Sequence, residues 1–336
     1  MAATRQNITI KDIARRAKVS KSTVSRVLNG TTAVAEEKKT AVLQAVADLN
    51  YQPNVMARGL AAGQSLTVGV LTQNISSPYN DAVLLGVLQG LRGSDYSPIF
   101  ADGSWILEQE EQAIQTLVAR QVDGLIVFGG ETPDETICDL ARQVPLVVAG
   151  RNIAKLPNQC VYVNNFAGAY QATQYLLELG HERVVHLTGK LSHVDAQERL
   201  RGYRQAMIDH GLSLDEELVV EGNFQEQSGV LAVETLLLRG RPFTAIFAGS
   251  DQMAYGVRLA LYRRGIRVPA EVSIVGFDDL GSSAYTTPPL TTVRQPAVKI
   301  GQTAAEALVA MLKNEPYIIP VFQTELIVRE SAMRYR

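Results

Sequence analysis

Residues 10–29 read IKDIARRAKVSKSTVSRVLN, and this stretch decides how the N-terminal part of the chain folds. Thr9 can cap a first helix, because Asp12 follows three residues later as in a capping box. Ser20 can cap a second helix, which ends at Asn29 before a glycine. Two short helices joined by a tight turn form a helix-turn-helix unit, whose second helix can lie in the major groove of DNA. The pattern therefore predicts such a unit here.

The second helix of this unit carries two chemically different faces. Val24 and Val27 form its apolar side. Three side chains on the opposite side can reach base edges: Lys21, Ser22 and Arg26. Arg26 can bind guanine through two hydrogen bonds, whereas the hydroxyls of Thr23 and Ser25 suit contacts with phosphates. The alternative is a generic small helical bundle whose polar face has no partner.

Two further segments complete the N-terminal part. Residues 36–49 predict a third helix, whose acidic start suits the positive end of the helix dipole. Pro53 opens a segment, 55–61, that is only about two turns long, and such a helix is marginal on its own. We interpret it as a hinge that a partner must order. The predicted domains are a helix-turn-helix DNA-binding domain, 1–52, and a hinge helix with linker, 53–64.

The charge of the chain is distributed unevenly. The formal net charge is -2, but residues 1–62 hold ten Lys/Arg and four Asp/Glu, whereas the remainder holds 22 basic and 30 acidic residues. A basic N-terminal part on an acidic body indicates that the first meets a polyanion and the second does not. Charge alone would equally allow a solvated basic surface without a partner.

From Leu66 onward, short apolar runs alternate with amphipathic helical stretches. Continuous Val/Ile/Leu runs between helices indicate parallel strands that are buried on both faces. The predicted strands are Thr67–Thr72, Pro98–Ala101, Gly124–Phe128, Leu146–Ala149, Val161–Val163, Val184–Leu187, Val219–Glu221, Ala245–Ala248, Ser273–Phe277 and Thr324–Val328. The predicted helices are Ala82–Gly93, Leu107–Arg120, Ala167–Leu179, Ala196–His210, Gln252–Arg264 and Ala297–Leu312. So many strands favour an α/β body of parallel sheets flanked by helices, 65–336, with two lobes: about 65–163 plus 295–322, and 164–294 plus 323–336.

Polar and aromatic side chains collect where the predicted strands end. Open parallel sheets bind ligands beyond the carboxyl ends of their strands, and two lobes facing each other there make a cleft. The mixture of carboxylates, amides, a guanidinium and aromatic rings suits a polyhydroxylated ligand. The alternative is that many of these side chains only cap helices and shape loops. The candidate ligand contacts are Asn74, Tyr79, Asn80, Arg151, His193, Asp195, Arg199, Phe224, Ser250 and Asp278.

Signals for an enzyme, a metal site or export are missing from the sequence. It has no phosphate-binding glycine loop, no HExxH and no nucleophile elbow, and its four histidines are scattered. Asp278 and Asp279 could form a carboxylate pair, but adjacent residues at a strand end usually point apart. Cys138 and Cys160 fit a reducing compartment. With no apolar signal segment or membrane span, we predict a cytoplasmic protein without catalytic residues, cofactor or metal.

Motifs along nearly the whole chain resemble the lactose-repressor/galactose-repressor family of bacterial transcriptional regulators. They comprise the stretch 10–29 together with Tyr51–Asn54, Ala57–Leu60, Val122–Ile126, Gly180-His181, Arg199–Tyr203, Ser250–Ala254, Val268-Pro269, Val272–Asp279 and Pro289–Val293. The resemblance implies a body like that of periplasmic binding proteins, which binds an effector and dimerises. It also implies a homodimer on a pseudo-palindromic operator in double-stranded DNA.

The resemblance also implies roles for single residues. In the family, the segment that holds Leu60 becomes a hinge helix on DNA, and this leucine wedges into the minor groove. Asn29, Asn54 and Arg58 join the DNA contacts on the same basis, and Arg199 and Asp278 become the leading effector contacts.

The chain departs from the family pattern at three places, which leave the identity of the effector open: Gly150-Arg151, Asn164 and His193. The chain also ends soon after its last strand, without the leucine-heptad tail of tetrameric members, which favours a dimer.

The sequence thus predicts a DNA-binding transcriptional regulator, most often a repressor in this family. A small effector bound between the lobes would control its affinity for the operator. A sugar or sugar derivative is the expected effector, and a purine or nucleoside is the alternative. A sugar-binding transport module and a sugar-processing enzyme are less favoured, because neither explains the basic helix-turn-helix.

Overall fold

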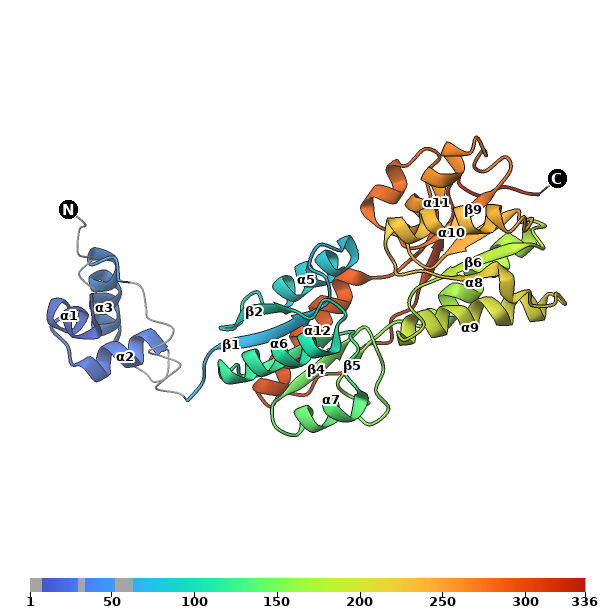
Figure 1. Ribbon diagram of the computed structural model, residues 1–336. Helices are drawn as coiled ribbons and strands as arrows, with labels where there is room; N and C mark the ends of the chain where they lie inside the picture. The colour runs from blue at the N-terminus through green and yellow to red at the C-terminus, as the bar shows by residue number, and fades with distance from the viewer. Residues whose placement is uncertain (1–7, 30–33, 52–62, 336) are drawn as a thin grey trace, which may run out of the picture. The chain divides into compact units, whose positions relative to one another are not determined.

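The computed structural model describes residues 8–29, 34–51 and 63–335, and the chain forms two compact units (Figure 1). The first unit comprises Met1–Leu66 and the second Thr67–Arg336. Each unit has its own hydrophobic core.

The described part of the first unit is a three-helix cluster. Its helices are α1 (Ile10–Arg16), α2 (Lys21–Asn29) and α3 (Glu36–Asp48). Ile13, Val24 and Val42 are fully buried between the three helices, so each helix contributes one apolar side to a common core. The capping box forms, because the backbone N–H and the hydroxyl of Thr9 both donate to the carboxylate of Asp12. Residues 55–61, predicted as a hinge, lie outside the described residues.

The second unit consists of two lobes, each with its own sheet. The five strands of the first lobe are all parallel, in the order β2-β1-β3-β4-β5. Their bounds are β1 Thr67–Thr72, β2 Ser97–Asp102, β3 Gly124–Phe128, β4 Leu146–Ala149 and β5 Cys160–Val161. The helices of this lobe are α5 Pro78–Gly90, α6 Leu107–Ala119, α7 Asp134–Ala141 and α12 Ala297–Leu312.

Helix α12 returns from near the C-terminus to the first lobe, where it lies against α5 (Figure 1). Glycines permit this close approach. A Cβ on Gly86 of α5 would lie 1.9 Å from the carbonyl oxygen of Val298, and one on Gly301 of α12 would lie 1.9 Å from that of Val83. The chain therefore passes between the lobes more than once, which places the cleft between segments far apart in sequence.

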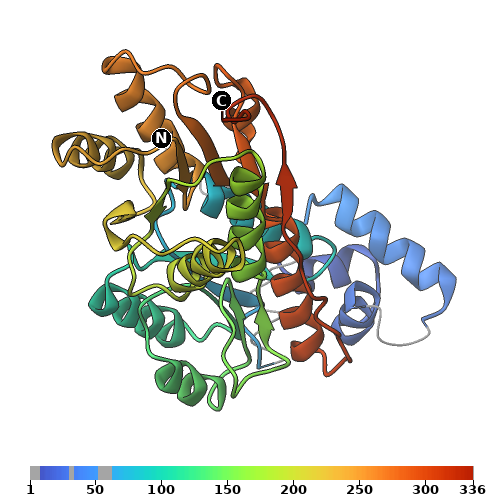
Figure 2. The ribbon, with the colours of Figure 1, turned by 90° about the vertical axis from the view of Figure 1, so that its right-hand side faces the viewer.

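The second lobe holds a six-stranded sheet in the order β11-β10-β9-β8-β6-β7. Its strands are β6 Val184–Thr188, β7 Val219–Glu221, β8 Ala245–Ala248, β9 Ser273–Asp278, β10 Thr291–Arg294 and β11 Glu325–Ile327. Its helices are α8 Asn165–Glu178, α9 Val194–Asp209, α10 Glu226–Leu238 and α11 Asp251–Arg263, with short 3₁₀ turns at Glu216–Leu218 and Gly281–Tyr285. Helices cover both faces of the sheet (Figure 2). Only the edge pair β10 and β11 is antiparallel among the described strands.

The predicted α/β class with two lobes and an all-α N-terminal unit is confirmed. Several elements differ from the prediction. Strand β10 and helices α7 and α10 were not predicted: β10 follows two prolines and spans only four residues, and α7 spans only eight. The predicted strand at 161–163 ends at Val161, while Val163 makes an isolated bridge to Phe322.

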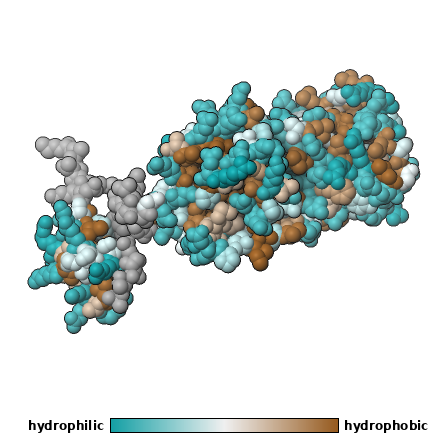
Figure 3. Space-filling model, turned by 90° about the horizontal axis from the view of Figure 1, so that it is seen from below, coloured by the Kyte–Doolittle hydropathy of each residue, from teal (hydrophilic) through white to brown (hydrophobic). Residues whose placement is uncertain are grey.

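Apolar and polar residues alternate over the face of the molecule seen in Figure 3. None of the helices that the structure describes is both long and apolar enough to cross a membrane.

Candidate functional site

Helix α2 presents its polar face outward. Lys21, Ser22 and Arg26 are exposed, and Val24 on the other face is fully buried. The hydroxyl of Ser20 accepts from the backbone N–H of Thr23 at 3.1 Å, so this cap fixes the start of the helix. The hydroxyl of Ser22 lies 2.7 Å from that of Ser20. The helix therefore begins with exposed polar side chains, as the helix-turn-helix prediction requires.

The remaining predicted DNA contacts have more varied surroundings. Thr23 and Ser25 are half-buried, and the hydroxyl of Thr23 lies 2.8 Å from that of Ser20. Asn29 is the last residue of α2. Three further residues lie outside the described part of the chain: Asn54, Arg58 and Leu60.

A cavity of about 200 Å³ lies in the second unit at the carboxyl ends of strands from both lobes. Nine of the ten predicted ligand contacts line it: Asn74, Tyr79, Asn80, His193, Asp195, Arg199, Phe224, Ser250 and Asp278. Ligands bind beyond the carboxyl ends of parallel strands, and this rule predicts that residues more than 200 positions apart in sequence line one cavity.

Arg199, in the second turn of α9, is buried on the floor of this cavity. Its Nε donates to Asn165 Oδ1 at 2.9 Å, and a second guanidinium nitrogen donates to the carbonyl oxygen of Gly249. The guanidinium carbon lies 3.8 Å from the ring centre of Phe277 and 5.4 Å from that of Phe224. Hydrogen bonds and cation–π contacts therefore hold the positive charge in place before any ligand arrives.

Asp278 faces the cavity from the end of β9. Its Oδ1 accepts from Gln295 Nε2 at 2.7 Å, and Gln295 Oε1 accepts from the hydroxyl of Tyr79 at 3.2 Å. Burial raises the pKa of Asp278 above its ordinary value, the Arg199 guanidinium opposes this rise, and the Asp251 carboxylate adds to it. Burial likewise raises the pKa of Tyr79. A ligand hydroxyl that bonds to Asp278 would supply the hydrogen bond that burial prevents water from making with this carboxyl group.

The neighbouring Asp279 points elsewhere, as predicted for adjacent residues at a strand end. Its carboxylate pairs with Arg294 Nε at 2.7 Å and with an Arg329 terminal nitrogen at 2.6 Å. Both residues have positive φ, 121° for Asp278 and 55° for Asp279, so the backbone turns sharply between the two side chains. They do not form a catalytic carboxylate pair.

Some predicted contacts also support the loops around the cavity. The side-chain amide of Asn80 donates to the carbonyl oxygens of Gln73 and Asn74. The hydroxyl of Ser250 accepts from Met253 N–H and donates to the carbonyl oxygen of Phe224, so it caps α11. Asn80 and Ser250 therefore shape a loop and cap a helix in addition to lining the cavity.

Arg151 is the one predicted ligand contact that does not line this cavity, so its contact with a ligand stays a prediction. Its terminal nitrogens donate to the carbonyl oxygens of Gly130 and Thr132, and it lines an adjoining hollow together with Trp105, His193 and Asp195. Arg151 was predicted because it follows the end of a strand. The positive φ of Gly150 redirects the chain just before this residue.

Several residues that line the cavity were not predicted: Ser77, Ser104, Trp105, Phe128, Lys190, Asn223, Gln225, Gln252 and Gln295. Trp105 could have been found, because it is the single tryptophan of the sequence and follows a predicted strand by four residues. Gln295 follows β10, which was itself not predicted.

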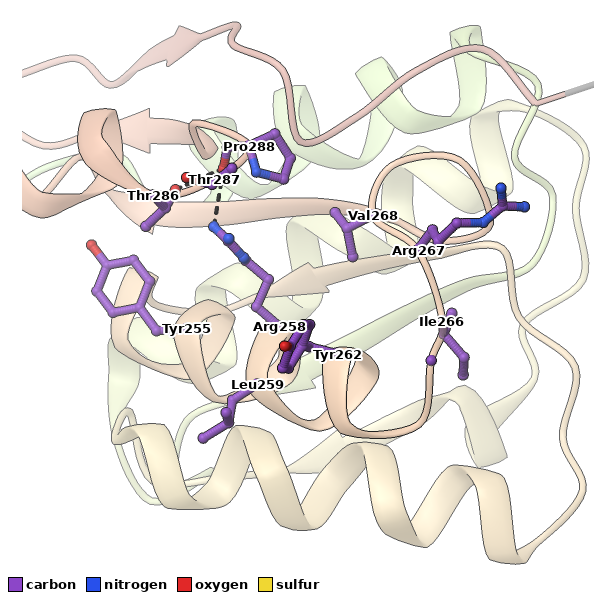
Figure 4. A pocket seen from close by; sticks show the side chains of 11 residues that line it. Tyr255, Arg258, Leu259, Tyr262, Ile266, Arg267, Val268, Thr286, Thr287 and Pro288 are labelled. Carbon is purple, nitrogen blue, oxygen red and sulfur yellow. Dashed lines mark hydrogen bonds between the residues drawn. The ribbon is translucent and has the colours of Figure 1, made fainter.

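A second hollow, of about 640 Å³, lies on the outer face of the second lobe between α11 and two loops (Figure 4). Its walls are mostly apolar and include Tyr255, Leu259 and Tyr262. Arg258 donates to the carbonyl oxygen of Pro288 across it at 3.0 Å (Figure 4). Tyr262 is 81% exposed, which is unusual for an aromatic side chain on a packed helix.

Comparisons with known proteins agree with both units. A family model described as "Bacterial regulatory proteins, lacI family" matches residues 9–54, and one described as "Periplasmic binding protein-like domain" matches residues 173–332. The ribose operon repressor of Haemophilus influenzae is 36% identical over 325 residues, which are 96% of this chain and 98% of that protein. The chain belongs to the lacI family of bacterial regulatory proteins.

Solved structures extend the likeness of this lacI-family chain to its whole length. A lac repressor dimer bound to operator and the anti-inducer ONPF matches with a TM-score of 0.87 at 28% identity, covering 98% of this chain and 100% of that chain. A complex of the transcriptional regulator CelR with cellobiose matches with a TM-score of 0.72 at 34% identity, covering 97% and 100%. This lacI-family chain is therefore a DNA-binding transcriptional regulator controlled by an effector, not an enzyme.

Proposed function

We propose that this regulator binds a sugar or sugar derivative in the cavity between its lobes. The observation that carries the proposal is the chemistry of the walls. The Asp278 carboxylate, the Arg199 guanidinium and the Asn74 amide can bond to hydroxyls, while the rings of Trp105 and Phe224 can cover the apolar face of a sugar.

A purine or nucleoside remains the alternative effector. The aromatic rings in the cavity wall, Tyr79, Trp105, Phe128 and Phe224, favour it, because a flat base can stack on any of them. The number of hydrogen-bonding groups around these rings favours a sugar, which carries a hydroxyl on nearly every carbon.

For DNA, we propose that α2 enters the major groove of a pseudo-palindromic operator. Lys21, Ser22 and Arg26 would reach base edges, and Thr23 and Ser25 would contact phosphates. Asn29, Asn54 and Arg58 would add contacts, and Leu60 would wedge into the minor groove. A chain with these DNA contacts acts on the genome, so we propose that it works in the cytoplasm, as a repressor.

The proposed mechanism is a population shift. An effector that binds better when the lobes are closed around it favours that arrangement, and the dimer then holds its two DNA-binding units at a different spacing. The effector loosens operator binding if it acts as an inducer and tightens it if it acts as a corepressor.

A thermal-shift screen of sugars, sugar phosphates, nucleosides and purines tests the effector class. A ligand at 100 times its Kd should stabilise the protein by about 2.7 kcal/mol. Mobility-shift assays on DNA duplexes selected for binding, with and without the ligands that stabilise the protein, then test whether these ligands change operator affinity. Stabilisation by nucleobases and by no sugar would overturn the sugar proposal, and the absence of any sequence preference would overturn the operator proposal.

We propose that the regulator is a homodimer that buries the hollow shown in Figure 4. Exposed Tyr262 of α11 lies at its rim, and Tyr285, also exposed, immediately precedes Thr286 in its wall. Replacing Tyr262→Asp should weaken the dimer at least tenfold, because a charge would enter an apolar interface. Sedimentation equilibrium measures this, with Ile208→Asp on α9 as the control of similar chemistry. Equal dimer affinity for both variants would place the interface elsewhere.

A further inference from the structure

The loop that follows β3, residues 129–132, bridges the first lobe to the second beside the effector cavity. Glu131 Oε1 accepts a hydrogen bond from Ser192 Oγ at 2.9 Å and lies 2.9 Å from His193 Nε2. Ser192 and His193 directly precede α9 in the second lobe. One carboxylate of the first lobe therefore holds two side chains of the other lobe.

The loop is anchored from beneath by a buried carboxyl group. Glu110 of α6 is fully buried, and its oxygens accept from the backbone N–H groups of Glu131 and Thr132 at 2.9–3.0 Å and from the hydroxyl of Thr132 at 2.6 Å. Gly130 makes room for this contact. Its φ is 100°, and a Cβ there would lie 2.6 Å from a Glu110 oxygen. The N–H groups of Glu131 and Thr132 are thus fixed by one residue.

The carbonyl groups of the same loop are fixed from another side. Arg151 donates to the carbonyl oxygen of Gly130 at 3.3 Å and to that of Thr132 at 2.7 Å. Glu131 stands between these two anchors, so its backbone has little freedom. A carboxylate on such a rigid loop can position a partner, because little conformational entropy remains to be lost.

His193 connects this bridge to the effector cavity. Its ring stacks on Trp105 of the first lobe at 4.2 Å between centroids, and it also faces Phe224 at 6.0 Å. All three rings line the cavity. The side chain of His193 is only 5% exposed. A shift of His193 would therefore change the wall against which an effector packs.

The bridge also selects the tautomer of His193. A carboxylate only accepts hydrogen bonds, so the ring nitrogen that faces Glu131, Nε2, carries the proton. Nδ1 is buried and has no hydrogen-bond partner among the described residues. The contact with Glu131 therefore fixes which edge of the ring faces the loop.

We propose that Glu131 is a positioning residue of the effector cavity, because it holds Ser192 and His193 across the lobes and so fixes the ring of His193 in the wall against which the effector packs. The role of the bridge toward the effector rests on the proposed function. Glu131 acts through His193 and does not need to touch the effector itself.

The first experiment needs no ligand, because Trp105 is the single tryptophan of the sequence and its fluorescence reports the stack with His193. Glu131→Ala should shift the emission to longer wavelength and increase quenching by iodide, and Glu131→Gln, which keeps the side-chain volume, should give a smaller shift. The matched control is Glu135→Ala. Glu135 lies four residues further on and pairs with Lys155 at 3.1 Å within the first lobe, where both are exposed. Emission and quenching equal to the control in both Glu131 variants would overturn the bridge.

The second experiment measures binding of D-ribose and cellobiose by calorimetry. Loss of the bridge should weaken binding of whichever sugar the wild type binds by about tenfold in Glu131→Ala and by less in Glu131→Gln, whose amide oxygen can still accept, with Glu135→Ala unchanged. Circular dichroism checks that the variants are folded. Unchanged affinity in a variant with shifted emission would overturn the positioning role. If neither sugar binds the wild type, the sugar found in the thermal-shift screen replaces them, and a screen without any sugar hit overturns the effector class. The fluorescence result decides in either case whether the bridge exists.

Discussion

Replacing Asp278→Asn should weaken effector binding about 100-fold and leave operator binding intact. The change keeps the shape of the side chain and suits the positive φ of this position, which asparagine tolerates. It removes a carboxyl group that can bond to two ligand hydroxyls inside a buried cavity, where each hydrogen bond contributes about 0.5–1.5 kcal/mol if the group is neutral and about 1.5–3 kcal/mol if it is ionised. Calorimetry with the sugar that the wild type binds measures the loss, and a mobility shift without effector measures operator binding.

The control for this variant is Asp139→Asn in helix α7. Asp139 is exposed and pairs with Arg142 one turn away, so it loses the same charge far from the cavity. It should bind effector and operator as the wild type does. An Asp278→Asn protein that still responds to effector would remove Asp278 from the binding site.

The same variant should also change how stability depends on pH. Burial raises the pKa of Asp278 in the folded state above the ordinary value of about 3.9 in the unfolded chain. The folded protein therefore binds this proton more tightly than the unfolded chain does. The contribution of this proton to the free energy of unfolding is complete at low pH, and it is lost as the pH rises through the raised pKa of Asp278. Ligand-free Asp278→Asn should lose less stability than the wild type between pH 4 and pH 8, as urea unfolding at several pH values would measure. If the free energies of unfolding of the wild type and Asp278→Asn change with pH in parallel, burial does not raise the pKa of Asp278.

Strand ends carried most of the information about the cavity in the sequence. Asn74, His193 and Asp278 were found because parallel strands bring their carboxyl ends to one edge of a sheet. Helix α2 could be predicted from the sequence equally well, since Val24 and Arg26 occupy opposite faces at helical spacing. These features depend on local periodicity and on topology, and both are readable along the chain.

The rest depends on contacts between distant segments. Whether Arg151 faces a ligand or the carbonyl groups of the loop at Gly130 depends on the path of that loop, which buried Glu110 determines. Gln295 became part of the site through β10, a strand too short for its pattern to stand out. Glu131 gave no signal, because an acidic residue after a glycine pair looks like any solvated loop residue.

Replacing Arg26→Ala should cost about 1–3 kcal/mol at the cognate operator and relax the preference at one base pair of each half-site. Arg26 is exposed on α2, on the face opposite buried Val24, so the change removes no packing from the core of the first unit. A guanidinium that makes two hydrogen bonds to one guanine discriminates against other bases, and alanine makes neither. Binding to a panel of operator variants, each with one changed base pair, measures the effect.

Lys39→Ala on α3 is the control, because it removes one positive charge from the same unit at a residue that pairs with Glu36. Loss of a phosphate contact weakens all sequences alike and lowers the slope of log K against log salt by about one. A base contact instead weakens the cognate sequence most and leaves non-cognate binding nearly unchanged. If Arg26→Ala lowers affinity equally across the panel and reduces the salt slope, Arg26 contacts the backbone, and the reading of the operator must come from Lys21 and Ser22 at the start of the helix.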